Sequence, residues 1–222
     1  MDGFVKICGL STADALSAAL EAGADMVGFV RFARSPRHIP LDIGHALSAA
    51  AAGRAQRVLL MVDPSDAELD EAVGAIGPDW VQLHGRESPE RVAAIRARGR
   101  PVLKAVGIAG PEDIAWAQTY RAVADALLLD AKSPPGGLPG GNGLAFDWRL
   151  LAGLDPAMKF MLSGGLDAGS VGEAIALTGA RAVDVSSGVE ARPGVKDPER
   201  IRAFVRAARA ALSANQTRAG RT

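Results

Sequence analysis

Short runs of apolar residues alternate with longer alanine-rich stretches along the chain, and this alternation occurs eight times. Apolar runs that are almost continuous are typical of parallel strands buried on both faces. We expect these strands at residues 5–9, 26–30, 57–62, 80–85, 102–106, 126–130, 159–164 and 182–187. We expect the connecting helices at residues 12–22, 41–52, 66–76, 89–98, 111–120, 147–152, 170–178 and 198–212.

Eight strand–helix units predict a (β/α)8 TIM barrel, a single-domain fold of the α/β class. A connection between neighbouring parallel strands needs a dozen or more residues, which helices of this length supply. A doubly wound open sheet is the structural alternative, but no G-x-G-x-x-G sequence follows the first strand. The barrel is expected to span residues 1–212, and the polar residues 213–222 to form a frayed C-terminal tail.

The composition argues against several classes of partner. The 25 basic and 25 acidic residues cancel among the 222 residues, so no overall charge attracts nucleic acid or an anionic membrane. No apolar run is long enough to span a bilayer, and the first residues lack the pattern of a secretory leader. A single cysteine excludes an intrachain disulfide and favours a reducing compartment. We therefore expect a cytoplasmic protein, either monomer or homodimer, that binds a small molecule.

That single cysteine, Cys8, ends the first expected strand, and the active sites of barrels form at the carboxyl ends of the strands. Side chains alternate along a strand, so Lys6 lies on the same face as Cys8. An ammonium group near the thiol would favour the thiolate that a base or a nucleophile needs. Two alternatives remain open: Cys8 as a small buried apolar residue, and Lys6 in a salt bridge inside the barrel.

Polar side chains end or follow other expected strands. Asp130 ends the sixth strand, Gln82 and His84 end the fourth, and Arg37 lies in the loop after the second. The planar guanidinium of Arg37 suits a carboxylate, although a solvated surface arginine is the alternative. Gln82 and His84 can orient groups of a ligand, and a structural histidine held by hydrogen bonds is the competing interpretation of His84.

Glycine-containing turns follow the last two expected strands, at Ser163-Gly164-Gly165 and Ser186-Ser187-Gly188. Backbone N–H groups at such turns and at a following helix terminus bind anions, and the loops after strands seven and eight are a frequent phosphate site in barrels. Glycines that only permit tight turns are the alternative. We predict a phosphate site at Gly164, Gly165, Ser187 and Gly188.

Between Val5 and about Val205 the chain resembles the phosphoribosylanthranilate isomerase family of tryptophan biosynthesis. The segments that carry the resemblance are K-I-C-G at residues 6–9, G-F-V at 28–30, S-P-R at 35–37, Q-L-H-G at 82–85, L-L-D at 128–130, F-D-W at 146–148, S-G-G-L at 163–166 and D-V-S-S-G-V-E at 184–190. Their order along the chain, with several of them at strand ends, makes the match specific.

This resemblance implies an Amadori rearrangement of N-(5-phosphoribosyl)anthranilate to 1-(2-carboxyphenylamino)-1-deoxyribulose 5-phosphate. By resemblance, Asp130 is the general acid that protonates the furanose ring oxygen, and Cys8 is the base that removes the C2 proton. Arg37 binds the anthranilate carboxylate, and Gln82 and His84 bind substrate. Neither a cofactor nor a metal is implied.

Two further aspartates and one glycine-rich segment also lie near the expected strand ends. Asp184 either contacts substrate or braces the phosphate turn, and Asp63, before Pro64, is interpreted as a helix-capping turn. The glycine-rich segment 134–143 is either a mobile lid or an inert loop. The chain departs from the family pattern at Arg31, where an aromatic or apolar residue is usual, and at Asn142, where threonine is usual. These departures raise questions about the wall near the second loop and the substrate contacts of the sixth.

Three other functions fit parts of the pattern. A related barrel isomerase of histidine biosynthesis performs the same rearrangement on another aminoaldose, but resembles a design with aspartates as acid and base. A pentose-phosphate epimerase would bind a metal through paired histidines and aspartates, and of the three histidines only His84 clearly ends a strand. A phosphate-binding barrel without catalysis is the third, and the presence of Cys8 and Asp130 argues against it.

Overall fold

The computed structural model describes residues 3–134, 136–137, 140–141, 143–155 and 158–219. Its strands are β1 (Phe4–Cys8), β2 (Met26–Arg31), β3 (Gln56–Met61), β4 (Trp80–Leu83), β5 (Val102–Ile108), β6 (Ala126–Ala131), β7 (Phe160–Leu162), β8 (Ala182–Val185), β9 (Glu190–Arg192) and β10 (Val195–Lys196). Its α-helices are α1 (Ala13–Glu21), α2 (Leu41–Ala51), α3 (Asp66–Ile76), α4 (Pro89–Arg96), α5 (Pro111–Gln118), α6 (Val171–Thr178) and α7 (Pro198–Ala219). Short 3-10 helices lie at η1 (Trp148–Gly153) and η2 (Ser187–Val189).

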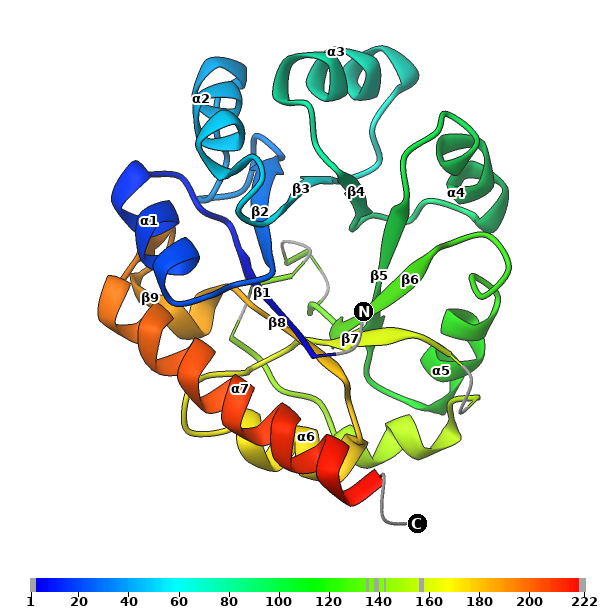
Figure 1. Cartoon of the computed structure of the whole chain (residues 1–222). Helices are drawn as coiled ribbons and strands as arrows, with labels where there is room; N and C mark the ends of the chain where they lie inside the picture. The colour runs from blue at the N-terminus through cyan, green and yellow to red at the C-terminus, as the bar shows by residue number, and fades with distance from the viewer. Residues whose placement is uncertain (1–2, 135, 138–139, 142, 156–157, 220–222) are drawn as a thin grey trace.

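Strands β1 to β8 form a closed barrel in which consecutive strands pair in parallel. The barrel closes where β8 pairs with β1, and this register places Lys6 opposite Asp184 and Ile7 opposite Val185. The helices lie around the outside of the barrel (Figure 1). The predicted (β/α)8 fold is therefore confirmed.

Local capping residues fix where several helices begin, and so keep the connections from strand to helix short. The side chain of Thr12 accepts from the N–H of Ala15 at the start of α1. Ser65 and Glu68 form a capping box at α3, in which each side chain accepts from the backbone N–H of the other residue. Such caps satisfy the N–H groups that have no partner within the helix.

The barrel wall separates an outer apolar layer from an inner one. Adjacent strand residues such as Met26 and Val27 point to opposite sides. Val27 belongs to the large cluster shared with the helices, and Met26 to a smaller cluster that includes Leu128 and Met161. Burial of each such side chain stabilises the fold by roughly 1.5–3 kcal/mol. The inner cluster thus fills part of the barrel interior with apolar side chains.

Two sequence expectations are wrong. The sixth connection has the 3-10 helix η1 where an α-helix was expected, because only five residues lie between the Asp147 cap and the helix-breaking Gly153. The expected frayed tail from residue 213 is also not seen, because α7 continues to Ala219. The sequence from Ser213 to Ala219 contains neither proline nor glycine, so nothing in it interrupts the helix.

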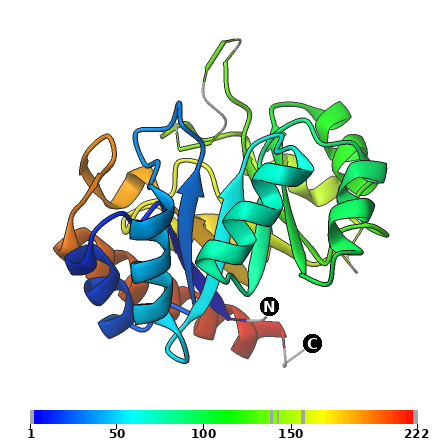
Figure 2. The ribbon, with the colours of Figure 1, turned by 90° about the horizontal axis from the view of Figure 1, so that it is seen from above.

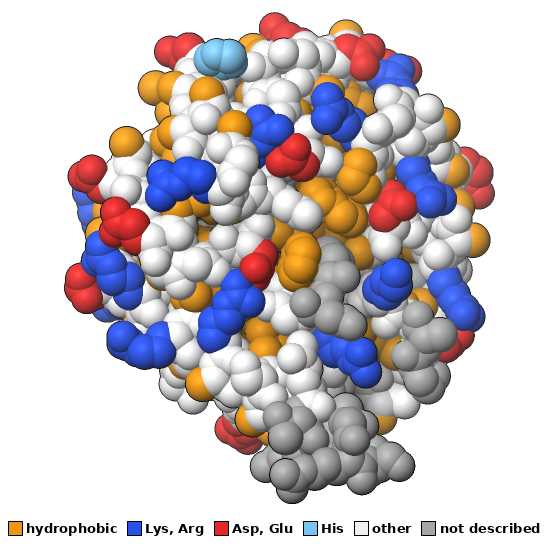
Figure 3. All heavy atoms as spheres, viewed as in Figure 1, with side chains coloured by type: hydrophobic (Ala, Val, Ile, Leu, Met, Phe, Trp, Pro, Cys, Tyr) orange, Lys and Arg blue, Asp and Glu red, His pale blue; other side chains and the backbone are white. Residues whose placement is uncertain are grey.

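The chain adds one feature to the eight units, an antiparallel hairpin of β9 and β10 between η2 and α7. Both termini lie at one end of the barrel, and the segment after β6 rises at the opposite end (Figure 2). On the face shown in Figure 3, basic and acidic side chains are interspersed. That distribution agrees with the balanced charge of the sequence.

A buried ion pair outside the predicted site links strand β5 to the loop after β4. Lys104 on β5 and Glu87 in the loop after β4 are both almost fully buried, with 2.6 Å between Nζ and Oε2. Lys104 Nζ also donates to the carbonyl of Gly85 at 2.8 Å. The Tyr120 hydroxyl donates to the carbonyl of Glu87 at 2.8 Å, and burial raises the pKa of Tyr120 to about 12.

We expect Lys104→Met to lower the free energy of unfolding by about 3 kcal/mol, because it leaves the buried Glu87 carboxylate without its cation. Urea unfolding of the variant and the wild type measures the difference. The matched control is Arg202→Met, which removes an exposed i,i+3 pair with Glu199 and should cost at most about 1 kcal/mol. Equal losses in the two variants would contradict the prediction.

Candidate active site

One pocket at the carboxyl ends of the strands brings together residues from most of the barrel. All the predicted site residues except Gly188 line this pocket, namely Cys8, Arg37, Gln82, His84, Asp130, Gly164, Gly165, Asp184 and Ser187. Apolar side chains of Val30, Phe32, Leu60 and Val62 form one part of its wall. Gly188 is not among the lining residues, but it lies close to one of them: a Cβ at this position would meet the carbonyl oxygen of Leu166 at 1.9 Å.

Cys8 is the last residue of β1 and is 4% exposed. It pairs with Gly28 on β2, where a Cβ would lie only 2.8 Å from the Cys8 sulfur. Because real Cβ atoms do not approach this closely, Gly28 leaves the space that the sulfur occupies. A glycine on the neighbouring strand thus sets the position of the thiol in the pocket.

Lys6 lies inside the barrel below Cys8 and forms a salt bridge with Asp184, with 2.7 Å between Nζ and Oδ1. Burial alone would lower the pKa of Lys6, but Asp184 and Cys8 outweigh it and the pKa is raised. Burial raises the pKa of Cys8; Lys6 opposes this rise and Asp184 adds to it. Lys6 thus both forms the salt bridge and favours the thiolate, but the thiol remains the favoured form at neutral pH.

Asp130 lies near the end of β6 with its carboxylate held on one side only. Oδ1 accepts from the N–H of Ala131 at 2.8 Å, while Oδ2 lies 3.5 Å from His84 Nε2. Gln82 Nε2 in turn lies 3.3 Å from His84 Nδ1. These contacts join Asp130, His84 and Gln82 into one row along the pocket wall. They also orient His84. The competing interpretation of His84, a structural histidine held by hydrogen bonds, therefore agrees in part with these contacts.

Gln82 has one polar atom that the protein does not satisfy. Its side chain is fully buried, and among the described residues its Oε1 has no hydrogen-bond partner. An unpaired buried acceptor costs free energy of about 1–3 kcal/mol. Since Gln82 lines the pocket, this oxygen is suited to accept a hydrogen bond from a ligand.

Arg37 is buried, with 7% exposure, so the alternative of a solvated surface arginine is wrong. Its Nε and Nη2 donate to the two carboxylate oxygens of Glu190 at 2.7 and 2.9 Å. Glu190 therefore occupies one edge of the guanidinium fork, and among the described residues Nη1 has no hydrogen-bond partner. Arg37 Nη2 also donates to the carbonyl of Gly141 at 3.1 Å.

Gly164 and Gly165 follow β7 with φ angles of +87° and +65°, in the left-handed region that favours glycine. No acceptor for either N–H is found within the described residues. Consecutive backbone N–H groups in such a turn form a concave anion site. Ser187 lines the same pocket but belongs to the 3-10 helix η2, so the second turn has a different geometry from the first.

Asp184 is held by the protein through both oxygens. Besides Lys6, it accepts from the hydroxyl of Ser163 at 3.3 Å, beside the Gly164 turn. This geometry favours the bracing role over direct substrate contact. The expected capping role of Asp63 is wrong: Ser65 caps α3, whereas Asp63 Oδ1 accepts from the N–H of Arg86 in the next loop.

Arg31 does not line the pocket. Its side chain instead contacts the loop after β2: Nη1 donates to the carbonyl of Ile39 at 2.8 Å and lies 3.3 Å from His38 Nε2. Its neighbours Val30 and Phe32 line the pocket instead. The departure from the family pattern at Arg31 therefore leaves this wall apolar.

The glycine-rich segment 134–143 contributes to the pocket through the residues that are described. Residues 135, 138–139 and 142 lie outside the described part, and with them the departure at Asn142. Gly140 and Gly141 line the pocket, and a Cβ at Gly140 would meet His84 Cε1 at 2.5 Å. This close approach places the segment directly over the site.

Sequence reasoning missed Glu190 and Lys196 as site residues. Both lie in the β9–β10 hairpin, beyond the eight units in which strand ends predict function. Glu190 follows the predicted turn Ser186-Ser187-Gly188, and the Pro193-Gly194 pair between Glu190 and Lys196 indicates a hairpin. That pair is the one signal from which the hairpin could have been found.

A family profile described as N-(5'phosphoribosyl)anthranilate (PRA) isomerase matches residues 5–207 of the chain. The chain belongs to this isomerase family. The predicted family and enzyme class are thereby confirmed. Among the relatives of this isomerase is the N-(5'-phosphoribosyl)anthranilate isomerase of Azorhizobium caulinodans, 64% identical over 214 residues that cover 96% of this chain and 94% of the relative. That of Rhodopseudomonas palustris is 54% identical over 213 residues, covering 95% and 100%.

Solved structures agree with the sequence relatives. The phosphoribosyl anthranilate isomerase of Thermotoga maritima superposes on this isomerase with a TM-score of 0.85 at 35% identity, covering 93% of this chain and 98% of that one. Another such isomerase, in complex with reduced 1-(o-carboxyphenylamino)-1-deoxyribulose 5-phosphate, gives a TM-score of 0.82 at 34% identity with the same coverage. The family likeness therefore includes the whole barrel.

No helix among the described residues of this isomerase is long and apolar enough to cross a membrane. No group of three or more His, Cys, Asp and Glu side chains among them is arranged to hold a metal ion.

Proposed function

We propose that this isomerase converts N-(5-phosphoribosyl)anthranilate into 1-(2-carboxyphenylamino)-1-deoxyribulose 5-phosphate in tryptophan biosynthesis, with Asp130 as acid and Cys8 as base. The observation that carries the proposal is that both residues line one pocket together with Arg37 and the Gly164 turn. A solved relative holds the reduced form of this product. The pocket offers matching groups for the two anionic ends of such a molecule, with the acid and the base between them.

Asp130 acts first. In its neutral form it donates a proton from Oδ2 to the furanose ring oxygen, and the C1–O bond breaks to give a Schiff base between C1 and the anthranilate nitrogen. The hydrogen bond from the Ala131 N–H fixes Oδ1 and directs the free Oδ2. His84 Nε2 lies 3.5 Å from Oδ2 along the pocket wall.

Cys8 acts second, as the thiolate. It removes the proton from C2, and the electron pair of the C–H bond forms the C1–C2 double bond of an enolamine. Tautomerisation of the enolamine then gives the ketone product: C1 takes back the proton held by Cys8, and the C2 hydroxyl loses its proton, which returns to Asp130 and restores the neutral acid. Burial raises the pKa of Cys8, so the neighbouring Lys6 is required to favour the reactive form.

Binding uses the remaining pocket residues. The Nη1 side of Arg37 faces the anthranilate carboxylate, while the N–H groups of Gly164, Gly165 and Ser187 receive the phosphate. The unpaired Oε1 of Gln82 accepts from a sugar hydroxyl or from the anthranilate N–H. The chemistry calls for neither metal nor cofactor. Because Cys8 is a free thiol, a reducing compartment suits the enzyme, and we place it in the cytoplasm.

The proposal is tested by incubating the purified wild-type protein with freshly prepared phosphoribosylanthranilate and following the loss of anthranilate fluorescence. We expect turnover that stops at the ketose product, identified by its chromatographic retention against an authentic standard and by its reduction with borohydride. Inorganic phosphate in the millimolar range is expected to compete with substrate at the glycine turn. Absence of turnover with authentic substrate would contradict the proposed activity.

A further inference from the structure

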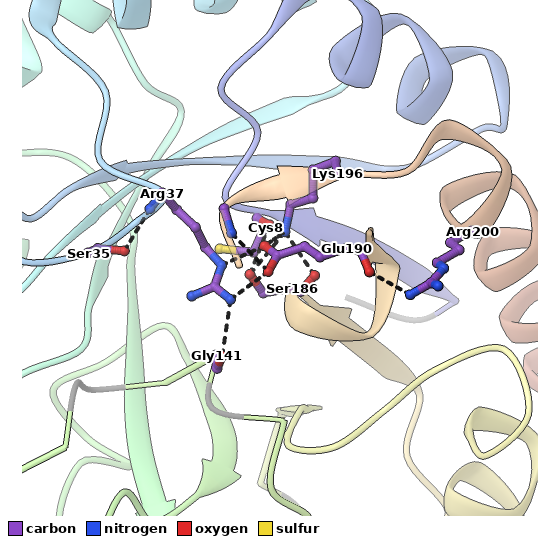
Figure 4. Close-up of polar contacts among 9 residues, drawn as sticks. Cys8, Ser35, Arg37, Gly141, Ser186, Glu190, Lys196 and Arg200 are labelled. Carbon is purple, nitrogen blue, oxygen red and sulfur yellow. Dashed lines mark hydrogen bonds and ion pairs between the residues drawn. The ribbon is translucent and has the colours of Figure 1, made fainter. Parts of the chain in front are cut away.

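The β9–β10 hairpin carries two buried charged residues to which the proposed reaction assigns no role. Glu190 begins β9 and Lys196 ends β10, and the two residues are 6% and 8% exposed. The hairpin is additional to the barrel, yet both side chains point back toward the end of β8 beside the pocket (Figure 4). Burial of two charges costs several kcal/mol each unless they are well paired.

Lys196 joins three groups with its ammonium. Nζ donates to the carbonyl and the hydroxyl of Ser186 at 2.8 and 3.1 Å, and to Glu190 Oε1 at 2.8 Å (Figure 4). The Ser186 hydroxyl in turn donates to the backbone carbonyl of Cys8 at 3.2 Å. One side of Lys196 is thus connected to the strand end that carries the thiol.

Its other side is connected to Arg37 through Glu190. Glu190 holds Arg37 by two hydrogen bonds and also accepts from the N–H of Gly194 at 3.2 Å. The fork of Arg37 therefore has its orientation set by a carboxylate whose position depends on Lys196. These contacts form one continuous chain from Arg37, which faces the anthranilate carboxylate, to Cys8, the base.

We propose that Lys196 is a positioning residue of the isomerase, which fixes Arg37 through Glu190 and keeps a positive charge facing the Cys8 thiol from the β9–β10 hairpin. The proposal rests on the function proposed above in the roles that it gives to Arg37 and Cys8. Lys196 itself touches neither substrate nor reacting atoms in this assignment.

The charges around the thiol agree with this role. Cys8 faces Lys6 from its own strand, Asp184 from β8 and Lys196 from β10, and the two lysines lower its pKa while Asp184 raises it. Burial lowers the pKa of Lys196 to about 8, against the opposing effect of Glu190. Lys196 is therefore charged at neutral pH, and loses its charge as the pH rises through about 8.

The test exploits the fact that Cys8 is the only cysteine of the chain, so alkylation reports on it alone. Iodoacetamide reacts with the thiolate, and its rate is measured across the neutral and alkaline pH range for the wild type, Lys196→Met and the control Lys159→Met. Lys159 is exposed just before β7, so the control removes the same charge far from the thiol. We expect the alkylation rate of Lys196→Met to be about tenfold below that of the wild type at neutral pH, where Lys196 is charged. The two rates should converge as the pH rises above about 8 and the wild-type Lys196 loses its charge.

Steady-state kinetics supply a second readout. With Glu190 no longer held by Lys196, Arg37 loses its fixed orientation, and we expect the KM of Lys196→Met to rise about tenfold. Lys196→Arg, which keeps the charge, is expected to restore the alkylation rate at neutral pH toward that of the wild type. Glu190→Gln, which preserves the side-chain shape, is the second route should Lys196→Met fail to fold. It removes the carboxylate that keeps Lys196 charged, so it should raise KM and lower the alkylation rate at neutral pH.

Two results would overturn the proposal. An alkylation profile of Lys196→Met that coincides with the wild type overturns the proposal, even if KM rises, because a purely structural residue would leave the thiol unaffected. An unchanged KM in a folded variant overturns it as well. Because alkylation needs no turnover, a failure of the proposed isomerase activity would be seen separately in the wild-type assay.

Discussion

Cys8→Ser is expected to lower kcat about 10³-fold, within the range that general bases contribute. Serine has nearly the size of cysteine, and the space left by Gly28 accommodates it without a shift of β1. Its hydroxyl, however, is far too weak an acid to form the base at neutral pH. The measurement is the rate of fluorescence loss at saturating substrate.

The binding groups remain in place in Cys8→Ser, so its KM should stay within about threefold of the wild-type value. Circular dichroism and the midpoint of urea unfolding serve as checks that the barrel is intact. Substrate deuterated at C2 adds a sharper readout, because proton removal becomes the slow step in this variant and its isotope effect should increase. A folded variant with kcat within tenfold of the wild type would remove Cys8 from the role of base.

Asp130→Asn is expected to lower kcat by about the same factor of 10³, because an amide cannot deliver the proton that opens the furanose ring. The asparagine oxygen can still accept from the Ala131 N–H, so the end of β6 keeps its hydrogen bond. Ring opening becomes the slow step. The isotope effect from C2 deuteration should therefore fall rather than rise, which distinguishes this variant from Cys8→Ser.

Asp14→Asn is the matched control for Asp130→Asn. Asp14 is exposed in the first turn of α1, and the same chemical change there should leave kcat and KM unaltered. If Asp130→Asn retained near-normal kcat, or if its isotope effect rose as in Cys8→Ser, the acid would have to be sought elsewhere in the pocket. His84, next to Asp130 Oδ2, would be the first residue to replace.

Strand periodicity was a reliable guide to the fold because each strand-helix unit is local. Apolar runs and the capping residues at Thr12 and Ser65 depend on neighbours within a few residues. The prediction of an α-helix at 147–152 was wrong for a related reason. The same local pattern is compatible with an α-helix or a 3-10 helix, and the short distance to Gly153 decided between them.

Strand ends also predicted most of the pocket, since in a parallel barrel all carboxyl ends meet at one face. This is why Cys8 and Asp130, 122 positions apart in the numbering, line the same cavity. The strand ends did not predict which side chains of the loops contact one another. Asp63 was interpreted as a helix cap from the residue that follows it, whereas its actual contact is Arg86 in the next loop.

The sequence by itself determined the barrel, its eight strands and the residues that end them, because these depend on periodicity and on local turns. Only the tertiary structure decided how the charges pair. Lys6 meets Asp184 because β8 closes against β1 in one particular register, and Arg37 meets Glu190 because a hairpin folds back over the second loop. Such pairs join residues more than 150 positions apart. No local sequence pattern encodes which of these charged residues meet. The pKa of the Cys8 thiol and the orientation of the Arg37 guanidinium nevertheless depend on these pairs.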